Sequence, residues 1–152
     1  MSEAKGTFSE SVLLEAIRAR AAGVRAEGVE VGPGDDCAVV AAGGARLLLT
    51  VDQLVMGRHV TAATPLDLVA RKAIARSVSD IAAMAGVPRW SLVSGVLPTA
   101  MDGERADALC ASLHGWGMRL GAPVVGGDIA RGEGPLVLSV TVVGEMPAAE
   151  EP

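Results

Sequence analysis

Aromatic residues are almost absent from this sequence of 152 residues, which has one Phe, two Trp and no Tyr. A buried core must therefore be built from aliphatic side chains, since hydrophobic residues still make up 50% of the chain. The only cysteines, Cys37 and Cys110, lie far apart and do not form a zinc-type spacing. We interpret both as ordinary buried thiols.

Runs of basic residues and long apolar segments are also missing. The formal net charge is -5, and no cluster of Lys or Arg stands out, which argues against binding to nucleic acid or to an anionic membrane. Residues 1–6 lack the apolar core of a signal peptide, and no stretch reaches the roughly 20 apolar residues that span a bilayer. We therefore expect a cytoplasmic protein with a single domain.

Hydrophobic periodicity predicts a chain of mixed helices and strands. Helices are predicted over residues 8–22, 65–85 and 102–120. Strands are predicted over residues 37–40, 46–51, 91–97, 124–125 and 136–143. Gly23 is expected to stop the first helix, and the Thr64 hydroxyl is expected to cap the second, with Pro65 as its first residue. The predicted class is α+β, a mixed or antiparallel sheet of about four strands covered by helices.

Two adjacent carboxylates, Asp35 and Asp36, follow the glycine turn at 32–34. One interpretation is a solvated loop, where water screens the like charges. The other is a binding site for a hard divalent cation, which takes oxygen ligands and offsets the repulsion. Whether further carboxylates converge on the same place decides between the two.

Four acidic residues share a pattern: the first follows a glycine turn, the second and fourth follow predicted strands, and the third lies late in a predicted helix. The four positions are Asp36, Asp52, Asp80 and Asp128. Strand ends commonly present functional groups, and a set of carboxylates with Thr50 contains only oxygen donors, which favours magnesium and a phosphate-bearing nucleotide. For Asp80 the alternative is an ion pair within its helix with Arg76, four residues earlier.

Five ordered motifs surround these residues. They are Gly34–Ala38, Thr50–His59, Lys72–Ala75, Ser79–Met84 and Gly126–Asp128. Together they resemble the N-terminal half of thiamine-monophosphate kinase, whose superfamily includes aminoimidazole ribonucleotide synthetase, selenophosphate synthetase and the hydrogenase-maturation dehydratase. The resemblance extends from about Phe8 to Met146 and implies the fold of that N-terminal domain.

The resemblance implies a kinase that uses Mg²⁺ and moves the γ-phosphoryl of ATP onto thiamine monophosphate, giving thiamine diphosphate. Metal ligands would be Asp36, Thr50, Asp52, Asp80 and Asp128. Gly127 and Asp128 would lie against the nucleotide phosphates, and His59 would face the thiamine substrate. No nucleophilic side chain is required, because phosphoryl transfer depends mainly on positioning and on cations. His114 matches no motif and is interpreted as structural.

Some positions depart from the family pattern. Val51 and Ser77 stand where the family commonly has Thr and Asn, and Ile129 and Ala130 replace a frequent Thr-Thr pair. The resemblance implies a domain over 1–146, followed at 147–152 by a tail or the start of a linker to a second domain that this sequence lacks. It also implies a homodimer formed through the sheet, and an isolated chain that is incomplete and inactive as an enzyme.

Two other functions are kept beside the kinase. The chain could belong to another ATP-dependent enzyme of the same superfamily, acting on a different small acceptor. It could also be a non-catalytic domain for dimerisation or nucleotide sensing. Activity on other acceptors would support the first alternative, and a dimer that does not bind nucleotide would support the second.

Overall fold

The computed structural model describes residues 9–21 and 26–147. Gly23 and residues 148–152, which carry the predicted first helix stop and most of the predicted tail, lie outside the described residues. The elements in chain order are α1 (Glu10–Ala21), β1 (Val29–Val31), β2 (Ala38–Ala42), β3 (Ala45–Val55), α2 (Leu66–Ala83), β4 (Val87–Pro98), α3 (Gly103–Arg119), β5 (Val124–Gly132) and β6 (Val137–Glu145).

The strands form one six-stranded sheet in the order β1-β2-β3-β6-β4-β5. Neighbouring strands are antiparallel except for β4 and β5, which are parallel and are connected through α3. The predicted α+β class is confirmed, whereas the sheet has six strands instead of about four. The short strand β1 was not predicted, because three residues are too few to show an alternating pattern.

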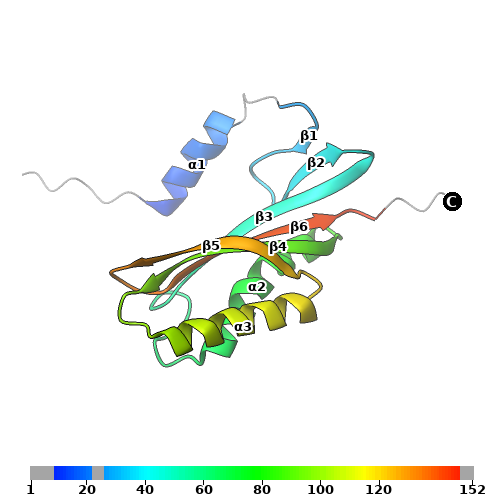
Figure 1. Cartoon of the computed structure of the whole chain (residues 1–152). Helices are drawn as coiled ribbons and strands as arrows, with labels where there is room; N and C mark the ends of the chain where they lie inside the picture. The colour runs from blue at the N-terminus through cyan, green and yellow to red at the C-terminus, as the bar shows by residue number, and fades with distance from the viewer. Residues whose placement is uncertain (1–8, 22–25, 148–152) are drawn as a thin grey trace, which may run out of the picture.

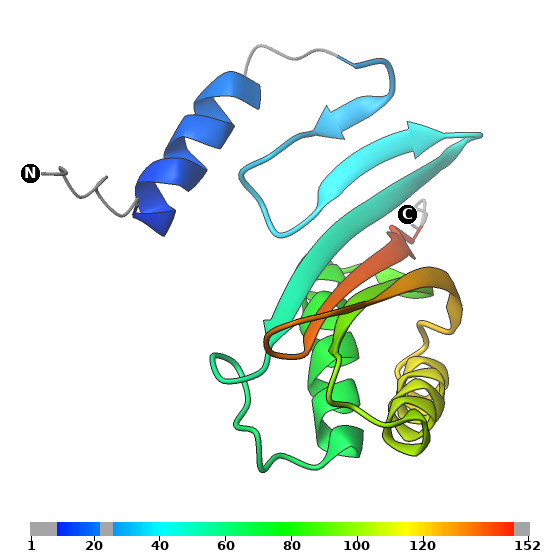
Figure 2. The same ribbon diagram turned by 60° about the vertical axis from the view of Figure 1, so that its left-hand side comes forward.

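Helices α2 and α3 cover one face of the sheet (Figure 1) and lie side by side there (Figure 2). The core between them is aliphatic, as the composition predicts, and includes Cys37, while Cys110 is only half-buried. Side chains alternate between the two faces along strand β6: Leu138, Val140 and Val142 point into the core and are buried, and the residues between them are not. Helix α1 has no buried residue and stands apart from the sheet.

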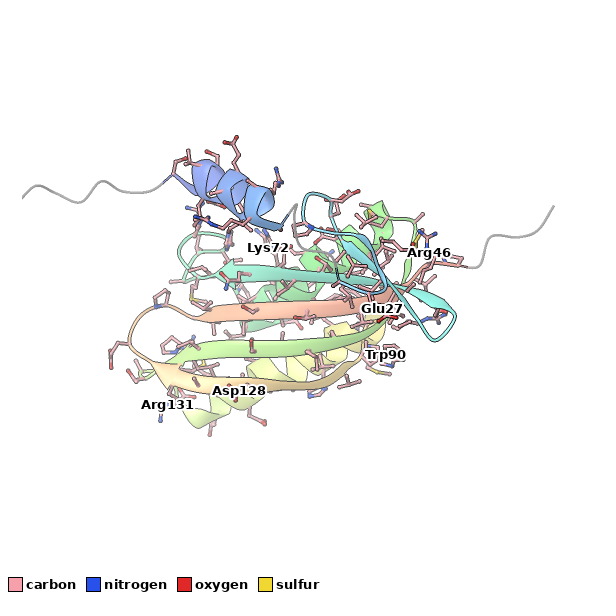
Figure 3. The ribbon with its side chains drawn as sticks, turned by 90° about the horizontal axis from the view of Figure 1, so that it is seen from above. Glu27, Arg46, Lys72, Trp90, Asp128 and Arg131 are labelled. Carbon is pink, nitrogen blue, oxygen red and sulfur yellow. The ribbon has the colours of Figure 1, made fainter. Side chains whose placement is uncertain are left out.

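The opposite face of the sheet carries exposed side chains (Figure 3). Five large apolar residues of β3 and β4 are at least partly exposed on it: Leu49, Val51, Trp90, Leu92 and Val96. We call this surface the open face. Patches of this kind on a sheet often mark an interaction surface.

The caps of α2 and α3 differ. The Asp102 side chain accepts a hydrogen bond from the Arg105 backbone N–H at 2.8 Å and so caps α3. The prediction that Thr64 caps α2 is wrong, since Pro65 is the cap residue, with ψ of 139°, and the Thr64 hydroxyl lies 3.1 Å from that of Thr61. Because Pro65 stays extended, the helix begins one residue later than predicted.

The predicted strand ends at Asp52 and Asp128 are also wrong. Strand β3 continues to Val55, where it still pairs with β6. Strand β5 continues through Gly126 and Gly127 to Gly132, because pairing with β4 holds the glycines in an extended ladder. Both aspartates therefore lie inside strands, so the side of the sheet on which each one points becomes decisive.

Candidate functional site

The acidic corner before β2 is built by its own side chains. Gly34 has φ of 140°, a conformation that favours glycine, and it turns the chain into Asp35. The Asp35 carboxylate accepts a hydrogen bond from the backbone N–H of Asp36 at 2.9 Å. Asp35 is thus engaged in shaping the turn, while the side chain of Asp36 makes no such bond in the turn.

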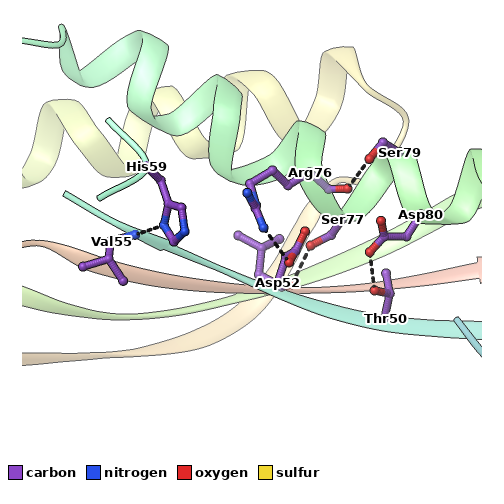
Figure 4. Close-up of polar contacts among 9 residues, drawn as sticks. Thr50, Asp52, Val55, His59, Arg76, Ser77, Ser79 and Asp80 are labelled. Atoms are coloured by element: carbon purple, nitrogen blue, oxygen red, sulfur yellow. Dashed lines mark hydrogen bonds and ion pairs between the residues drawn. The ribbon is translucent and has the colours of Figure 1, made fainter. Parts of the chain in front are cut away.

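Thr50 and Asp52 lie two residues apart in β3 and share the face that α2 covers. The Thr50 hydroxyl donates to the Asp80 carboxylate at 2.7 Å, and the Arg76 guanidinium donates to Asp52 at 3.0 Å (Figure 4). The alternative of an ion pair within the helix is therefore not what forms. Arg76 and Asp80 each bind a residue of β3 instead of each other.

The charges of this cluster act on one another. Burial raises the pKa of Asp80 above its ordinary value, and the negative charges of Asp52 and Asp36 raise it further. The hydrogen bond from Thr50 and the charge of Arg76 act in the opposite direction. Three carboxylates therefore lie within electrostatic reach at one end of α2, and we call Asp36, Thr50, Asp52 and Asp80 the acidic cluster.

The negative charges of the acidic cluster also act on the thiol of Cys37, which is next to Asp36. Its pKa is raised to about 11, first by burial and then by the charges of Asp80, Asp36 and Asp35. A thiol with such a pKa stays protonated near neutral pH and is therefore a poor nucleophile. The excess charge around it is what a bound cation would neutralise.

Asp128 does not join the acidic cluster. It pairs with Ser94 of β4, which pairs with Ser139 of β6, which in turn pairs with Gln53 of β3. These four polar residues form a row across the open face and line a shallow hollow of about 250 Å³. Asp52 is next to Gln53 and points to the other side of the sheet.

Among residues 9–21 and 26–147, no three acidic, histidine or cysteine side chains lie close enough to bind one ion between them. Asp36, Asp52 and Asp80 lie within electrostatic reach of one another and Asp128 lies elsewhere, while their role as metal ligands stays a prediction.

Gly127 has a structural reason to be glycine. Its φ is 154°, and a Cβ atom there would overlap the carbonyl oxygen of Val93 in the neighbouring strand. The close approach of β5 to β4 therefore requires glycine at this position. Gly126, one residue earlier, faces only the Leu92 side chain, at 3.2 Å from such a Cβ atom.

His59 lies in the loop after β3 and is held on two sides. Its Nδ1 atom accepts a hydrogen bond from the Val55 backbone N–H at 2.8 Å, and its backbone carbonyl accepts one from the Lys72 ammonium at 2.6 Å. Because Nδ1 is an acceptor, the neutral ring carries its proton on Nε2. His59 is half-buried, whereas His114 is exposed on α3.

The sequence did not predict the contacts made by Ser77 and Arg76, nor which face of the sheet Val51 occupies. The Ser77 hydroxyl is buried and donates to the backbone carbonyl of Val140 at 2.8 Å, and Arg76 binds Asp52. The spacing of four between residues 72, 76 and 80 put them on one face, but gave no partner across the sheet. Val51 is 64% exposed on the open face, so no hydroxyl is missing from the acidic cluster there.

Comparisons with known proteins identify the family. Residues 34–146 match the family described as AIR synthase related protein, N-terminal domain. The chain belongs to this family. The AIR synthase superfamily named from the five motifs is thereby confirmed. Because the match begins at residue 34, it includes all of the acidic cluster and β2 to β6, and excludes α1 and β1.

Curated relatives of this AIR synthase related domain are thiamine-monophosphate kinases. That of Mycobacterium tuberculosis is 38% identical over 120 residues, covering 78% of this chain and 35% of its own length. That of Escherichia coli is 36% identical over 124 residues, covering 78% and 36%. The chain thus spans about a third of the length of these relatives.

Solved structures agree on the fold. The structure of AaThiL complexed with AMPPCP and TMP matches with a TM-score of 0.80 at 29% identity, covering 93% of this chain and 45% of that one. HypE in its complex with HypF has a TM-score of 0.65 at 15% identity, covering 90% and 43%, and shows the fold alone. Among the described residues of the AIR synthase related domain, no helix is long and apolar enough to cross a membrane.

Proposed function

We propose that this chain is the nucleotide- and magnesium-binding part of a kinase that phosphorylates thiamine monophosphate with ATP to give thiamine diphosphate. The observation that carries the proposal is the acidic cluster, three carboxylates and a hydroxyl brought together by β3, α2 and the corner before β2. The names of the relatives, and the AMPPCP and TMP complex of AaThiL, point to the same reaction.

The donor set of the acidic cluster fits Mg²⁺. All four side chains offer oxygen, and Mg²⁺ commonly binds proteins through one or two carboxylates while keeping waters and substrate phosphate oxygens. The absence of three close acidic ligands in the described residues is compatible with that coordination. Asp36, Thr50, Asp52 and Asp80 would hold Mg²⁺ between them, with no more than two of the three carboxylates on one ion, and the bound metal would supply positive charge against the phosphate oxygens.

Substrate contacts are assigned to residues outside the acidic cluster. His59 would meet the thiamine phosphate, and its geometry makes Nε2–H the group offered, because Nδ1 already accepts from Val55. Gly127 and Asp128 would contact the nucleotide, with Asp128 as a further metal ligand. No protein nucleophile takes part, since the acceptor oxygen belongs to the substrate phosphate.

Asp128 is separated within one chain from Thr50 and Asp52 of the acidic cluster, which lie on the face of the sheet that α2 covers. It lies on the open face and three strands away from β3. That face exposes Val51 to 64% and Trp90 to 49%, which a dimer formed through the sheets would cover. In this proposal the homodimer buries the open face and places Asp128 at the dimer interface, on the side of the sheet away from Thr50 and Asp52.

The reaction is tested in a chimera, because the chain spans only a third of its relatives. Residues 34–146 replace the matching part of the Mycobacterium tuberculosis kinase, and thiamine diphosphate formation from thiamine monophosphate, ATP and Mg²⁺ is measured. Asp52→Asn should lower turnover by at least about a hundredfold, as expected for loss of a metal ligand. Asp107→Asn, exposed on α3, is the matched control and should leave turnover unchanged.

Two outcomes would overturn the proposal. If the Asp52→Asn chimera turns over as fast as the unmodified chimera, the acidic cluster takes no part in the reaction. A chimera that consumes ATP with a different small acceptor, and not with thiamine monophosphate, would assign this chain to another enzyme of the superfamily.

A further inference from the structure

Arg76 makes an incomplete ion pair with Asp52. Only its Nη2 atom contacts the carboxylate, at 3.0 Å from Oδ1, and the Nε atom is buried without a hydrogen-bond partner among the described residues. A guanidinium that fully engages a carboxylate uses two parallel hydrogen bonds. The side chains also remain 36% and 27% exposed, so water and ions can reach the pair.

Other groups on this face of α2 have different partners. Lys72, one turn earlier, donates to the backbone carbonyl of His59, and Asp80, one turn later, accepts from Thr50. Among the described residues, Arg76 is the cation whose side chain contacts a carboxylate of the acidic cluster. Its charge also acts on Asp80, so it partly neutralises two carboxylates at once.

A divalent cation and this guanidinium compete for the same carboxylate. Two positive ions held at one Asp52 side chain repel each other strongly in a half-buried site, where water screens the charges incompletely. A single hydrogen bond in a solvent-accessible pair is also easily broken. Metal binding at Asp52 therefore has to move the Arg76 guanidinium or work against its charge.

We propose that Arg76 is a resident counter-ion of the acidic cluster, which a divalent cation displaces from Asp52 when it binds. This inference rests on the proposed metal site and adds that the chain itself weakens metal binding there. The role is one of positioning through Asp52 and involves no contact with the reacting atoms.

The test compares metal affinity, measured by calorimetry with Mg²⁺ and by electron paramagnetic resonance with Mn²⁺, for the unmodified chain and two variants. Arg76→Met should bind both ions about tenfold more tightly, because one opposing charge is removed. Arg71→Met is the matched control, because it removes the same charge from the same helix. Arg71 lies over the Trp116 ring, 5.4 Å from its centroid, and not against the acidic cluster. Its affinity should change by less than about twofold.

Unchanged or weaker binding by Arg76→Met would overturn the inference while leaving the metal site in place. Absence of binding by every form, including the unmodified chain, would instead overturn the metal site and the inference with it. A double variant separates competition from a general charge effect, because Asp52→Asn should remove the gain produced by Arg76→Met.

A measurement on the unmodified chain covers the case in which Arg76→Met fails to fold. The side-chain Nε signal of Arg76 is followed by NMR while Mg²⁺ is added. Displacement predicts that this signal shifts, and that its proton exchanges faster with water, in proportion to metal bound. A signal that does not change at saturating Mg²⁺ would contradict displacement.

Discussion

Replacing Gly127 with alanine separates a structural role of this glycine from a role in nucleotide contact. The residue has φ of 154°, and an added Cβ atom would overlap the Val93 carbonyl oxygen and lie 2.7 Å from its carbonyl carbon. Both atoms belong to the backbone of β4, so no side-chain rotation can relieve the overlap. Either β5 moves away from β4 or the backbone of residue 127 changes conformation.

The magnitude follows from two contributions. A non-glycine residue in this backbone region costs about 1–3 kcal/mol, and overpacking against fixed atoms costs about 1–3 kcal/mol more. We expect Gly127→Ala to lower the free energy of unfolding by about 2–6 kcal/mol, a large part of the 5–15 kcal/mol of a typical domain. For a chain of this size the melting temperature should fall by about 10 °C.

The assay is urea unfolding followed by circular dichroism, without nucleotide or metal. Gly126→Ala is the matched control, because its added Cβ would meet only the movable Leu92 side chain at 3.2 Å. It should change the free energy of unfolding by about 1 kcal/mol or less. Equal stability of the two variants would refute the close approach of β5 to β4. If Gly127→Ala is the less stable variant, any decrease in its nucleotide binding has to be corrected for the fraction of protein that is unfolded.

Three further predictions concern buried polar groups. Asp80→Asn should stabilise the metal-free chain at neutral pH by about 1 kcal/mol or less, measured by urea unfolding. The pKa of Asp80 is higher in the folded state, so the stability of the chain falls as pH rises above the ordinary value of 3.8 and the carboxyl loses its proton. Lower stability of Asp80→Asn would contradict the burial of Asp80 and its repulsion by neighbouring carboxylates. At pH 8 a thiol reagent should label Cys110 at least about tenfold faster than Cys37, whose pKa is about 11, and equal rates by mass spectrometry would refute this. Ser77→Ala should cost about 1 kcal/mol by loss of its buried hydrogen bond to β6, whereas Ser79→Ala, exposed on the same helix, should cost less than half as much; equal unfolding midpoints would count against it.

Residues that are close in sequence were placed correctly by local rules. Thr50 and Asp52 are two residues apart in a strand and therefore share a face, and residues 72, 76 and 80 share a face of a helix. The contact between these two faces depends on how α2 packs on β3, which no local pattern encodes. The partners of Arg76 and Asp80 were missed for that reason.

Asp128 shows a different limit. Strand β5 has one extra residue, Val125, between the residues that pair with Ser91 and Leu92 of β4. This irregularity reverses which side of the sheet the following residues face, and it places Asp128 beside Ser94 on the open face. A shift of one residue at a glycine-rich edge strand leaves no signal in the sequence. The Gly126–Asp128 motif singled out Asp128 as a candidate site residue but did not show on which face of the sheet it lies.

The central claim is that the acidic cluster binds Mg²⁺ together with nucleotide phosphates. The most direct measurement is calorimetric titration of the chain with a non-hydrolysable ATP analogue, with and without Mg²⁺, for the unmodified protein, Asp52→Asn and Asp107→Asn. We predict binding that requires Mg²⁺, weakened at least about tenfold by Asp52→Asn and unaffected by Asp107→Asn. Binding that is equally tight in Asp52→Asn, or independent of Mg²⁺, would contradict the claim.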